Sequence, residues 1–241
     1  MKMRNFAAAI ILFLGVTAFG QQNFASISFG ACLPLGDYAL EGDFSSNGYA
    51  KAGGAIKFDG AFFPGSYLGI GGSFSFGSNF AMNDSLLGDM LDYIIANAPS
   101  LPEIPEEAEK LYANGFWNNI SLFIGPHFSV RATQRLYFDI RVLGGFTVLR
   151  PPDQELFVSW DDNEIHSRVS NNKLTFGFTA GGGLRYKLNE DLALKLGVDF
   201  NQAKAKFDYT FELFRDIDVP PVEAEFFVRT MDIMVGLAYA F

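Results

Sequence analysis

The carboxyl-terminal stretch, residues 225–241, reads EFFVRTMDIMVGLAYAF. From Met231 onward the odd positions are large and apolar or aromatic, whereas the even positions are small or polar except for Met234. Successive side chains of a β-strand point to opposite faces, so alternation over this length predicts a strand with one apolar face and one small or polar face. The strand ends on the aromatic residue Phe241.

The same alternation recurs in seven earlier segments. They cover about 23–33, 49–63, 67–80, 116–131, 135–149, 172–188 and 191–207. Each apolar row has the depth of about ten residues of tilted strand, which fits the hydrocarbon thickness of a bilayer. No continuous apolar helix follows the amino-terminal region, so a membrane span must be made of strands. The sequence therefore predicts an all-β fold, an eight-stranded antiparallel up-and-down transmembrane β-barrel.

The connections alternate between short and long. The short ones are 64–66, 132–134 and 189–190, and the long ones are about 34–48, 81–115, 150–171 and 208–224. Transmembrane barrels have tight periplasmic turns and long extracellular loops, so both termini are expected on the periplasmic side. Aromatic residues near the turn-side strand ends predict an interfacial girdle. These are Phe63, Tyr67, Tyr137, Tyr186 and Tyr239.

The amino terminus has the pattern of a secretory signal peptide. Lys2 and Arg4 precede an apolar run over 6–19, which ends in the small residues around Gly20. The run is shorter than the ~20 residues of a spanning helix. We expect cleavage before Gln21, which leaves residues 21–241 as one outer-membrane barrel domain. The single cysteine, Cys32, excludes an internal disulfide and lies too far downstream for lipidation at the cleavage point.

Gly236, Tyr239 and Phe241 match an assembly signal, a glycine followed at plus three and plus five by apolar or aromatic residues. With the eight segments, this signal resembles the outer-membrane β-barrel family of Gram-negative bacteria, which includes the small OmpA-type and porin-family barrels. The resemblance covers residues 23–241. It implies location in the cell outer membrane, insertion by the barrel assembly machinery with periplasmic chaperones, and contact with outer-membrane lipid and lipopolysaccharide.

Further partner predictions follow from charge and barrel size. The formal net charge is −9, and removal of a signal peptide with two basic residues makes it more negative, so no nucleic-acid partner is expected. We expect a monomer. The competing fold is a soluble lipocalin-like barrel, in which the apolar row points inward. The polar rows here are mostly Gly, Ser, Thr and Ala, too sparse in charge for a water-facing wall, so the transmembrane barrel is preferred.

If the apolar rows face lipid, eight charged side chains point into a narrow lumen. They are Lys57, Asp59, Asp139, Arg141, Arg185, Lys195, Asp199 and Asp232. Desolvated charges at this density are tolerated when they are paired. The preferred interpretation is a salt-bridge plug that fills the barrel. The alternative is a narrow, gated ion path through the same groups.

The sequence does not predict an enzyme, and it predicts no cofactor and no metal ligand. His127 and Ser129 lie two residues apart on one strand, which gives neighbours rather than an oriented triad. His166 lies near Asp161 and Asp162 in the third long loop, but outer-membrane protease barrels have ten strands. All four long loops are acidic, yet none has the spacing of a calcium-binding loop.

The second long loop is predicted to be partly helical. Asn83 and Asp84 are expected to cap a helix with an apolar stripe, and a second short helix is expected from Glu106 to Asn114. The stripe comprises Leu86, Leu87, Met90, Leu91, Ile94 and Ile95. We expect it to form a lid over the barrel. The predicted function is structural or surface-interacting, and the alternative is a narrow channel or small-ligand transport barrel gated by this loop.

Overall fold

The computed structural model describes residues 23–65, 67–98, 109–112, 115–152, 155–160, 163–169, 172–213 and 219–241. The predicted signal peptide, residues 1–20, lies outside the described residues. Among the residues described, no helix is both long enough and apolar enough to span a membrane.

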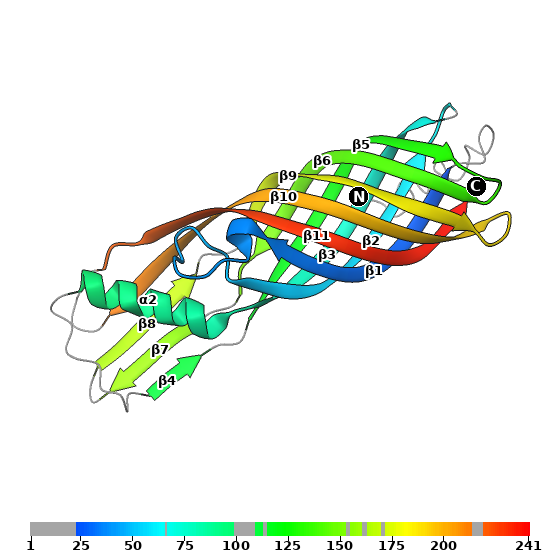
Figure 1. The fold of residues 1–241 in the computed structure, drawn as a ribbon. Helices are drawn as coiled ribbons and strands as arrows, with labels where there is room; N and C mark the ends of the chain where they lie inside the picture. Colours follow the sequence, from blue (N-terminus) through cyan, green and yellow to red (C-terminus); the bar gives the residue numbers. More distant parts are fainter. Residues whose placement is uncertain are drawn as a thin grey trace, which may run out of the picture.

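Eight strands form a closed antiparallel barrel (Figure 1). They are β1 (Phe24–Leu35), β2 (Ala50–Phe62), β3 (Leu68–Ala81), β5 (Phe116–Arg131), β6 (Leu136–Arg150), β9 (Lys173–Lys187), β10 (Leu192–Leu213) and β11 (Val222–Ala240). Each pairs with the next in this order, and β11 closes the ring by pairing with both β10 and β1. The eight predicted segments and the all-β fold class are confirmed, with boundaries that differ by a few residues except at the extended outer end of β10.

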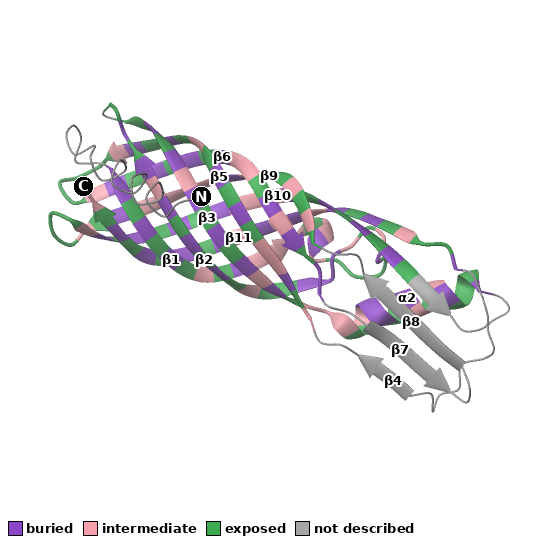
Figure 2. Cartoon of the chain, turned by 180° about the vertical axis from the view of Figure 1, so that it is seen from behind, coloured by how far each residue is buried: buried purple, intermediate pink, exposed green. Residues whose placement is uncertain are grey.

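Burial alternates along the barrel strands, which gives the wall a chequered pattern in Figure 2. The large apolar side chains of each row are exposed on the outside, as Leu122, Ile140 and Leu196 show. The other face holds small, polar and charged side chains that are buried inside the ring. A wall that is apolar outside and polar inside is the pattern of a transmembrane barrel, and it excludes the lipocalin-like alternative.

One side of the barrel continues beyond the ring as a sheet. β8 (Asn163–Val169) pairs with the outer part of β10, β7 (Glu155–Trp160) pairs with β8, and β4 (Glu109–Tyr112) pairs with β7. The third long connection contains the β7–β8 hairpin, which no sequence prediction described. One sequence prediction is wrong here, because residues 109–112 of the predicted helix over 106–114 are a strand. Pairing with neighbouring strands has overridden the local helix pattern.

Helix α2 (Asn83–Asn97) lies at the end of the barrel opposite to the carboxyl terminus (Figure 1). Its buried side chains join loop 1 (residues 36–49, between β1 and β2) and the inner faces of β10 and β11 in one apolar cluster. The stripe therefore packs on its own barrel, as expected for a lid. They are Leu86, Leu87, Met90 and Ile94. Ile95 is exposed. The predicted cap is wrong, because Met82 is the N-cap residue and makes no side-chain capping bond.

Candidate functional site

The centre of the barrel lumen is organised around Arg141, on β6. Its Nε and Nη2 donate to the two carboxylate oxygens of Asp199 at 2.9 and 2.6 Å, and its Nη1 donates to Asp59. All three side chains are buried. A planar guanidinium that binds one carboxylate in a fork and a second through its remaining nitrogen fixes the position of both acids.

Two lysines and a third aspartate complete this group. Lys57 Nζ lies 2.7 Å from Asp199 Oδ2 and 3.4 Å from Asp232 Oδ2, and Lys195 forms an ion pair with Asp59. The six residues carry three positive and three negative formal charges. We call them the central network: Lys57, Asp59, Arg141, Lys195, Asp199 and Asp232. Because each buried charge of the central network has a partner of opposite sign, the network can be tolerated away from water.

A second, separate ion pair lies nearer the short-turn end of the barrel. Arg185 donates from Nε and Nη2 to the two oxygens of Asp139 at 2.6 and 2.9 Å, and from Nη2 to Ser129 Oγ at 2.9 Å. The Arg185 guanidinium stacks 3.8 Å above the ring of Phe24, and the ring of Tyr137 lies 5.3 Å away. Both aromatic rings are buried and pack beside the pair.

His127 is buried next to this pair but does not form a triad. Its Nε2 lies 3.5 Å from Asp139 Oδ1 and makes no hydrogen bond. The imidazole packs edge-on against Phe24 and Phe63, each at 5.6 Å between ring centroids. Ser129, the candidate nucleophile beside it, is buried and accepts a hydrogen bond from Arg185. The arrangement holds His127 as a buried lumen residue packed between Phe24, Phe63 and the Arg185–Asp139 pair.

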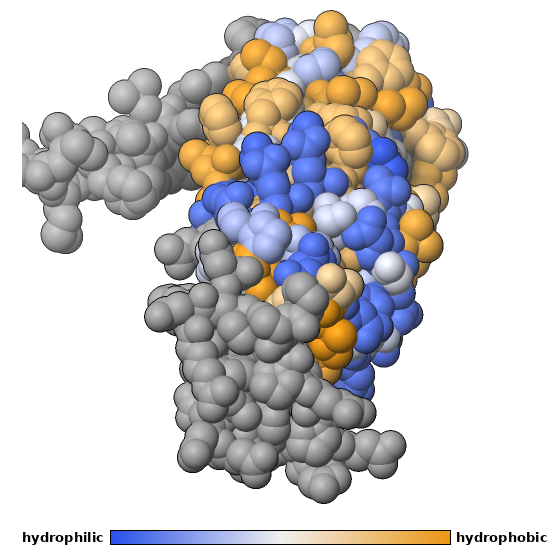
Figure 3. Space-filling view, turned by 90° about the vertical axis from the view of Figure 1, so that its left-hand side faces the viewer, coloured by the Kyte–Doolittle hydropathy of each residue, from blue (hydrophilic) through white to orange (hydrophobic). Residues whose placement is uncertain are grey.

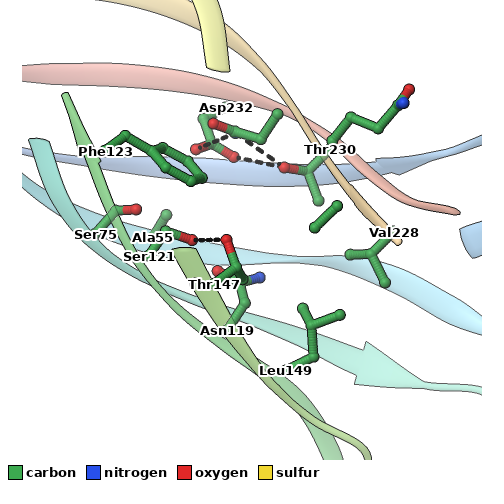
Figure 4. A pocket seen from close by; sticks show the side chains of 14 residues that line it. Ala55, Ser75, Asn119, Ser121, Phe123, Thr147, Leu149, Val228, Thr230 and Asp232 are labelled. Carbon is green, nitrogen blue, oxygen red and sulfur yellow. Dashed lines mark hydrogen bonds between the residues drawn. The ribbon is translucent and has the colours of Figure 1, made fainter. Parts of the chain in front are cut away.

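Above the central network is a small polar cavity of about 20 Å³ (Figure 4). Asn201 Nδ2 donates to Asp232 Oδ2 at 2.8 Å and to Thr230 Oγ1 at 3.0 Å, and the hydroxyls of Ser121 and Thr147 are 2.9 Å apart. This volume has room for about one water molecule. In the described part of the chain, no group of three or more His, Cys, Asp or Glu side chains could hold a metal ion.

The outer end of the lumen is closed by an apolar cap. Trp117, on β5, is 2% exposed and donates from Nε1 to the carbonyl oxygen of Gly48 at 2.7 Å. Its ring packs against Tyr38, Phe207 and Phe226. Tyr38, from the short 3-10 helix η1 (Gly36–Tyr38), and Phe44 and Tyr49 of loop 1 are therefore buried in the same apolar cluster as α2.

Loop 1 and α2 are joined by two hydrogen bonds at the edge of the cap. The Tyr49 hydroxyl and the Gly42 N–H both donate to the carboxylate of Asp89, on α2. Burial raises the pKa of Tyr49 far above its ordinary value, and the adjacent Asp89 carboxylate raises it further. Tyr49 also has a positive φ of 52°, which is uncommon for a residue with a side chain. The phenol therefore stays protonated and acts as a fixed donor.

Replacing Tyr49 by phenylalanine is expected to loosen α2. The ring stays, but the donor to Asp89 is lost, at a cost of about 1–2 kcal/mol for a hydrogen bond to a charged group. Hydrogen exchange of the α2 amides should accelerate while that of β5 and β6 stays unchanged. Tyr186→Phe, on the exposed outer wall, is the control. Equal exchange of α2 amides in the Tyr49 variant and the wild type would contradict the role of this contact.

The structure places all eight predicted lumen charges on the inner face and brings them together in the central network and the Arg185–Asp139 pair. Sequence reasoning missed Ser26 and Asn201, which bind charged residues of the lumen, and the neutral lumen residue Asn79. Asn79 is fully buried and donates from Nδ2 to the carbonyl oxygens of Cys32 and Lys51 at 2.9 and 3.0 Å. The sequence signal that could have identified Asn79 as a lumen residue is its position on the polar face of β3.

The predicted girdle is partly wrong. Phe63 and Tyr137 point inward and are buried, whereas Tyr67, Tyr186 and Tyr239 are exposed on the outer wall. A shift of one residue in the alternation near a turn moves a side chain from the outer face of the sheet to the inner face. The sequence near a strand end therefore does not show whether an aromatic ring points outward or inward.

The residues of the predicted assembly signal lie at the closing strand. Tyr239 is exposed on the outer wall, and the terminal Phe241 is exposed as well. Gly236 faces inward, directly opposite Ser28 on β1. An added Cβ there would lie 2.1 Å from the carbonyl oxygen of Ile27, so only glycine fits.

A closed eight-stranded ring with an apolar outer wall and a charged interior defines a transmembrane β-barrel. A family model for the outer membrane protein beta-barrel domain matches residues 6–241. The chain belongs to this family, which places it in the bacterial outer membrane.

Solved structures with a similar fold are outer-membrane barrels at low sequence identity. OprG from Pseudomonas aeruginosa is 12% identical with a TM-score of 0.54, and 92% of this chain and 97% of that chain are covered. The Ail protein of Yersinia pestis is 14% identical with a TM-score of 0.41, covering 91% and 99%. The protease OmpT from Escherichia coli is 10% identical with a TM-score of 0.47, covering 94% and 99%. No curated protein matches the chain.

Proposed function

We propose that this protein is a sealed outer-membrane barrel with a structural or surface-interaction role, and that it is not an enzyme. The observation that carries the proposal is the balanced central network. Its charges are within ion-pair distance of one another across the lumen, and apolar or aromatic groups lie beyond it in both directions. An ion entering this network would have to break paired, desolvated charges, which is costly.

The extension outside the barrel supports the surface role. β10 and β11 carry alternating charges on the face away from α2, and Lys206 pairs with Glu223 at 2.7 Å while Lys204 pairs with Glu225. Seen from the α2 end, hydrophilic side chains cover the centre of the described face, and apolar side chains border it above (Figure 3). The barrel would present this hydrophilic surface of the extension at the cell surface.

The alternative is a narrow channel or small-ligand transport barrel, gated by the second loop. The polar cavity beneath the cap favours it, because removal of α2 would bring that cavity closer to the outside. The two functions differ in which barrier matters. A sealed barrel is closed by the central network, whereas a gated channel is closed by the lid.

Replacing residues 83–97 by a short Gly/Ser linker separates the two functions. The variant, checked for folding by its heat-dependent gel mobility, would be examined in planar bilayers beside the wild type. We expect neither protein to give conductance steps, because the central network is intact in both. Reproducible steps in the linker variant alone would support the gated channel and contradict a sealed barrel.

A further inference from the structure

A groove of about 310 Å³ lies on the outer wall of the barrel, over the seam where β1 and β11 pair to close the ring. Ala25, on β1, is exposed there and is directly opposite Tyr239 on β11. Its side chain is a single methyl group among larger side chains of β1, β2, β10 and β11, and the groove is the space that this short side chain leaves. The larger side chains are Ile27, Phe58, Leu192, Leu237 and Tyr239.

The lining of the groove is apolar apart from one hydroxyl group. Ser26 also borders the groove, but its hydroxyl donates to Asp59 inside the lumen at 2.8 Å, so the Ser26 side chain points away from it. The Tyr239 side chain is exposed on the outer wall, and among the residues that the structure describes its hydroxyl makes no hydrogen bond. The groove therefore offers a ligand an apolar surface and one free hydrogen-bond donor.

The depth of the groove in the membrane is indicated by Tyr239. Tyrosines on the wall of a membrane protein lie in the headgroup region, and Tyr67 and Tyr186 are exposed on the outer wall at the same end of the barrel. Ile27 and Leu237 are one outward row further along their strands, toward the middle of the wall. The groove therefore begins at the level of the lipid ester and phosphate groups and extends into the hydrocarbon region.

The shape of the groove favours a flexible chain over a second protein. The volume is that of about ten water-sized groups, and a methylene group is of similar size, so the groove can hold a segment of one acyl chain. A second barrel presents a convex wall, which would touch the larger side chains around Ala25 without filling the space between them. Hydrocarbon also surrounds the outer wall of a transmembrane barrel at this depth.

We propose that this groove binds one acyl chain of a phospholipid in the leaflet at the short-turn end, which faces the periplasm in barrels of this class. The Tyr239 hydroxyl donates to an ester or phosphate oxygen of the same lipid, and the chain lies over Ala25 and across the β1–β11 seam. The site is on the outer wall, so it is independent of whether the lumen conducts.

The test counts the lipids that stay on the barrel. The full mature chain is refolded in phosphatidylcholine vesicles, checked by its heat-dependent gel mobility, released in mild detergent and weighed by native mass spectrometry. The wild type should retain one phospholipid. Ala25→Phe fills the groove and should lower the retained fraction by about tenfold or more, because several methylene groups lose their burial. Tyr239→Phe should lower it by about two- to tenfold, the range for one hydrogen bond.

Ala31→Phe is the matched control, because Ala31 is exposed on the same face of the same strand and lies outside the groove. It should retain the phospholipid as the wild type does. A wild type that retains none, or an Ala25→Phe barrel that retains as much as Ala31→Phe, would overturn the proposal. If the wild type is a dimer and Ala25→Phe a monomer, the groove is an interface between copies. If added palmitate replaces the phospholipid at equal concentration, the site takes a free fatty acid and the phospholipid assignment is wrong.

Discussion

Replacing Arg141 by alanine is expected to lower the free energy of unfolding by about 3–5 kcal/mol, the range for removing one partner of a buried ion pair. Arg141 neutralises Asp59 and Asp199 together, and both carboxylates are buried. Without the guanidinium, three buried aspartates of the central network face two lysines. The measurement is urea-induced unfolding from lipid vesicles, followed by the heat-dependent gel shift.

Two matched variants define what the Arg141 result means. Lys173→Ala breaks an exposed pair with Asp208 and should cost at most about 1 kcal/mol. Arg141→Lys keeps the charge but cannot bind Asp199 in a fork, so it should fall between wild type and alanine. A loss for Arg141→Ala as small as that for Lys173→Ala would mean that the central network does not stabilise the barrel.

The barrel itself could be predicted because one period, two residues, is repeated in every strand and controls the whole wall. A lipid-facing row must be apolar throughout, so even residues far apart in sequence, such as Ile27 and Leu237, follow the same rule. The same two-residue period predicted which charged residues lie on the inner face of the barrel. Lys57 and Asp199 are 142 positions apart, and only the shared inner face indicated that they meet.

The extension and the details of the lumen could not be predicted in the same way. Outside the membrane a strand needs no continuous apolar row, so β7 and β8 read as loop and β4 as helix. The pairing of particular charges also has no sequence signal. Asp199 binds both Arg141 and Lys57, whereas Asp139 binds Arg185, because of strand stagger and side-chain length rather than any local motif.

Replacing Gly181 by alanine is expected to be nearly as damaging as removing Arg141. Gly181 on β9 is directly opposite Asp199 on β10. An added Cβ would lie 1.9 Å from Asp199 Oδ1 and 2.6 Å from the Val198 carbonyl oxygen, distances at which atoms overlap. The aspartate must move off Arg141 or the strand must shift. Overpacking costs about 1–3 kcal/mol, and the weakened ion pair adds to it.

Gly197→Ala is the matched control for Gly181→Ala. Gly197 is also a glycine in the wall, two residues from Asp199, but the nearest atom to its added Cβ is the Gly182 carbonyl oxygen at 3.7 Å, an ordinary contact. It should change the free energy of unfolding by less than about 1 kcal/mol, in the range of a tolerated substitution.

The double variant Gly181→Ala/Arg141→Ala then decides the mechanism. If the methyl group acts by displacing Asp199 from Arg141, both single variants break the same ion pair. The loss of unfolding free energy in the double variant will then be smaller than the sum of the losses in the two single variants. Fully additive losses would instead mean that Gly181 matters for the backbone of β9 and not for the central network.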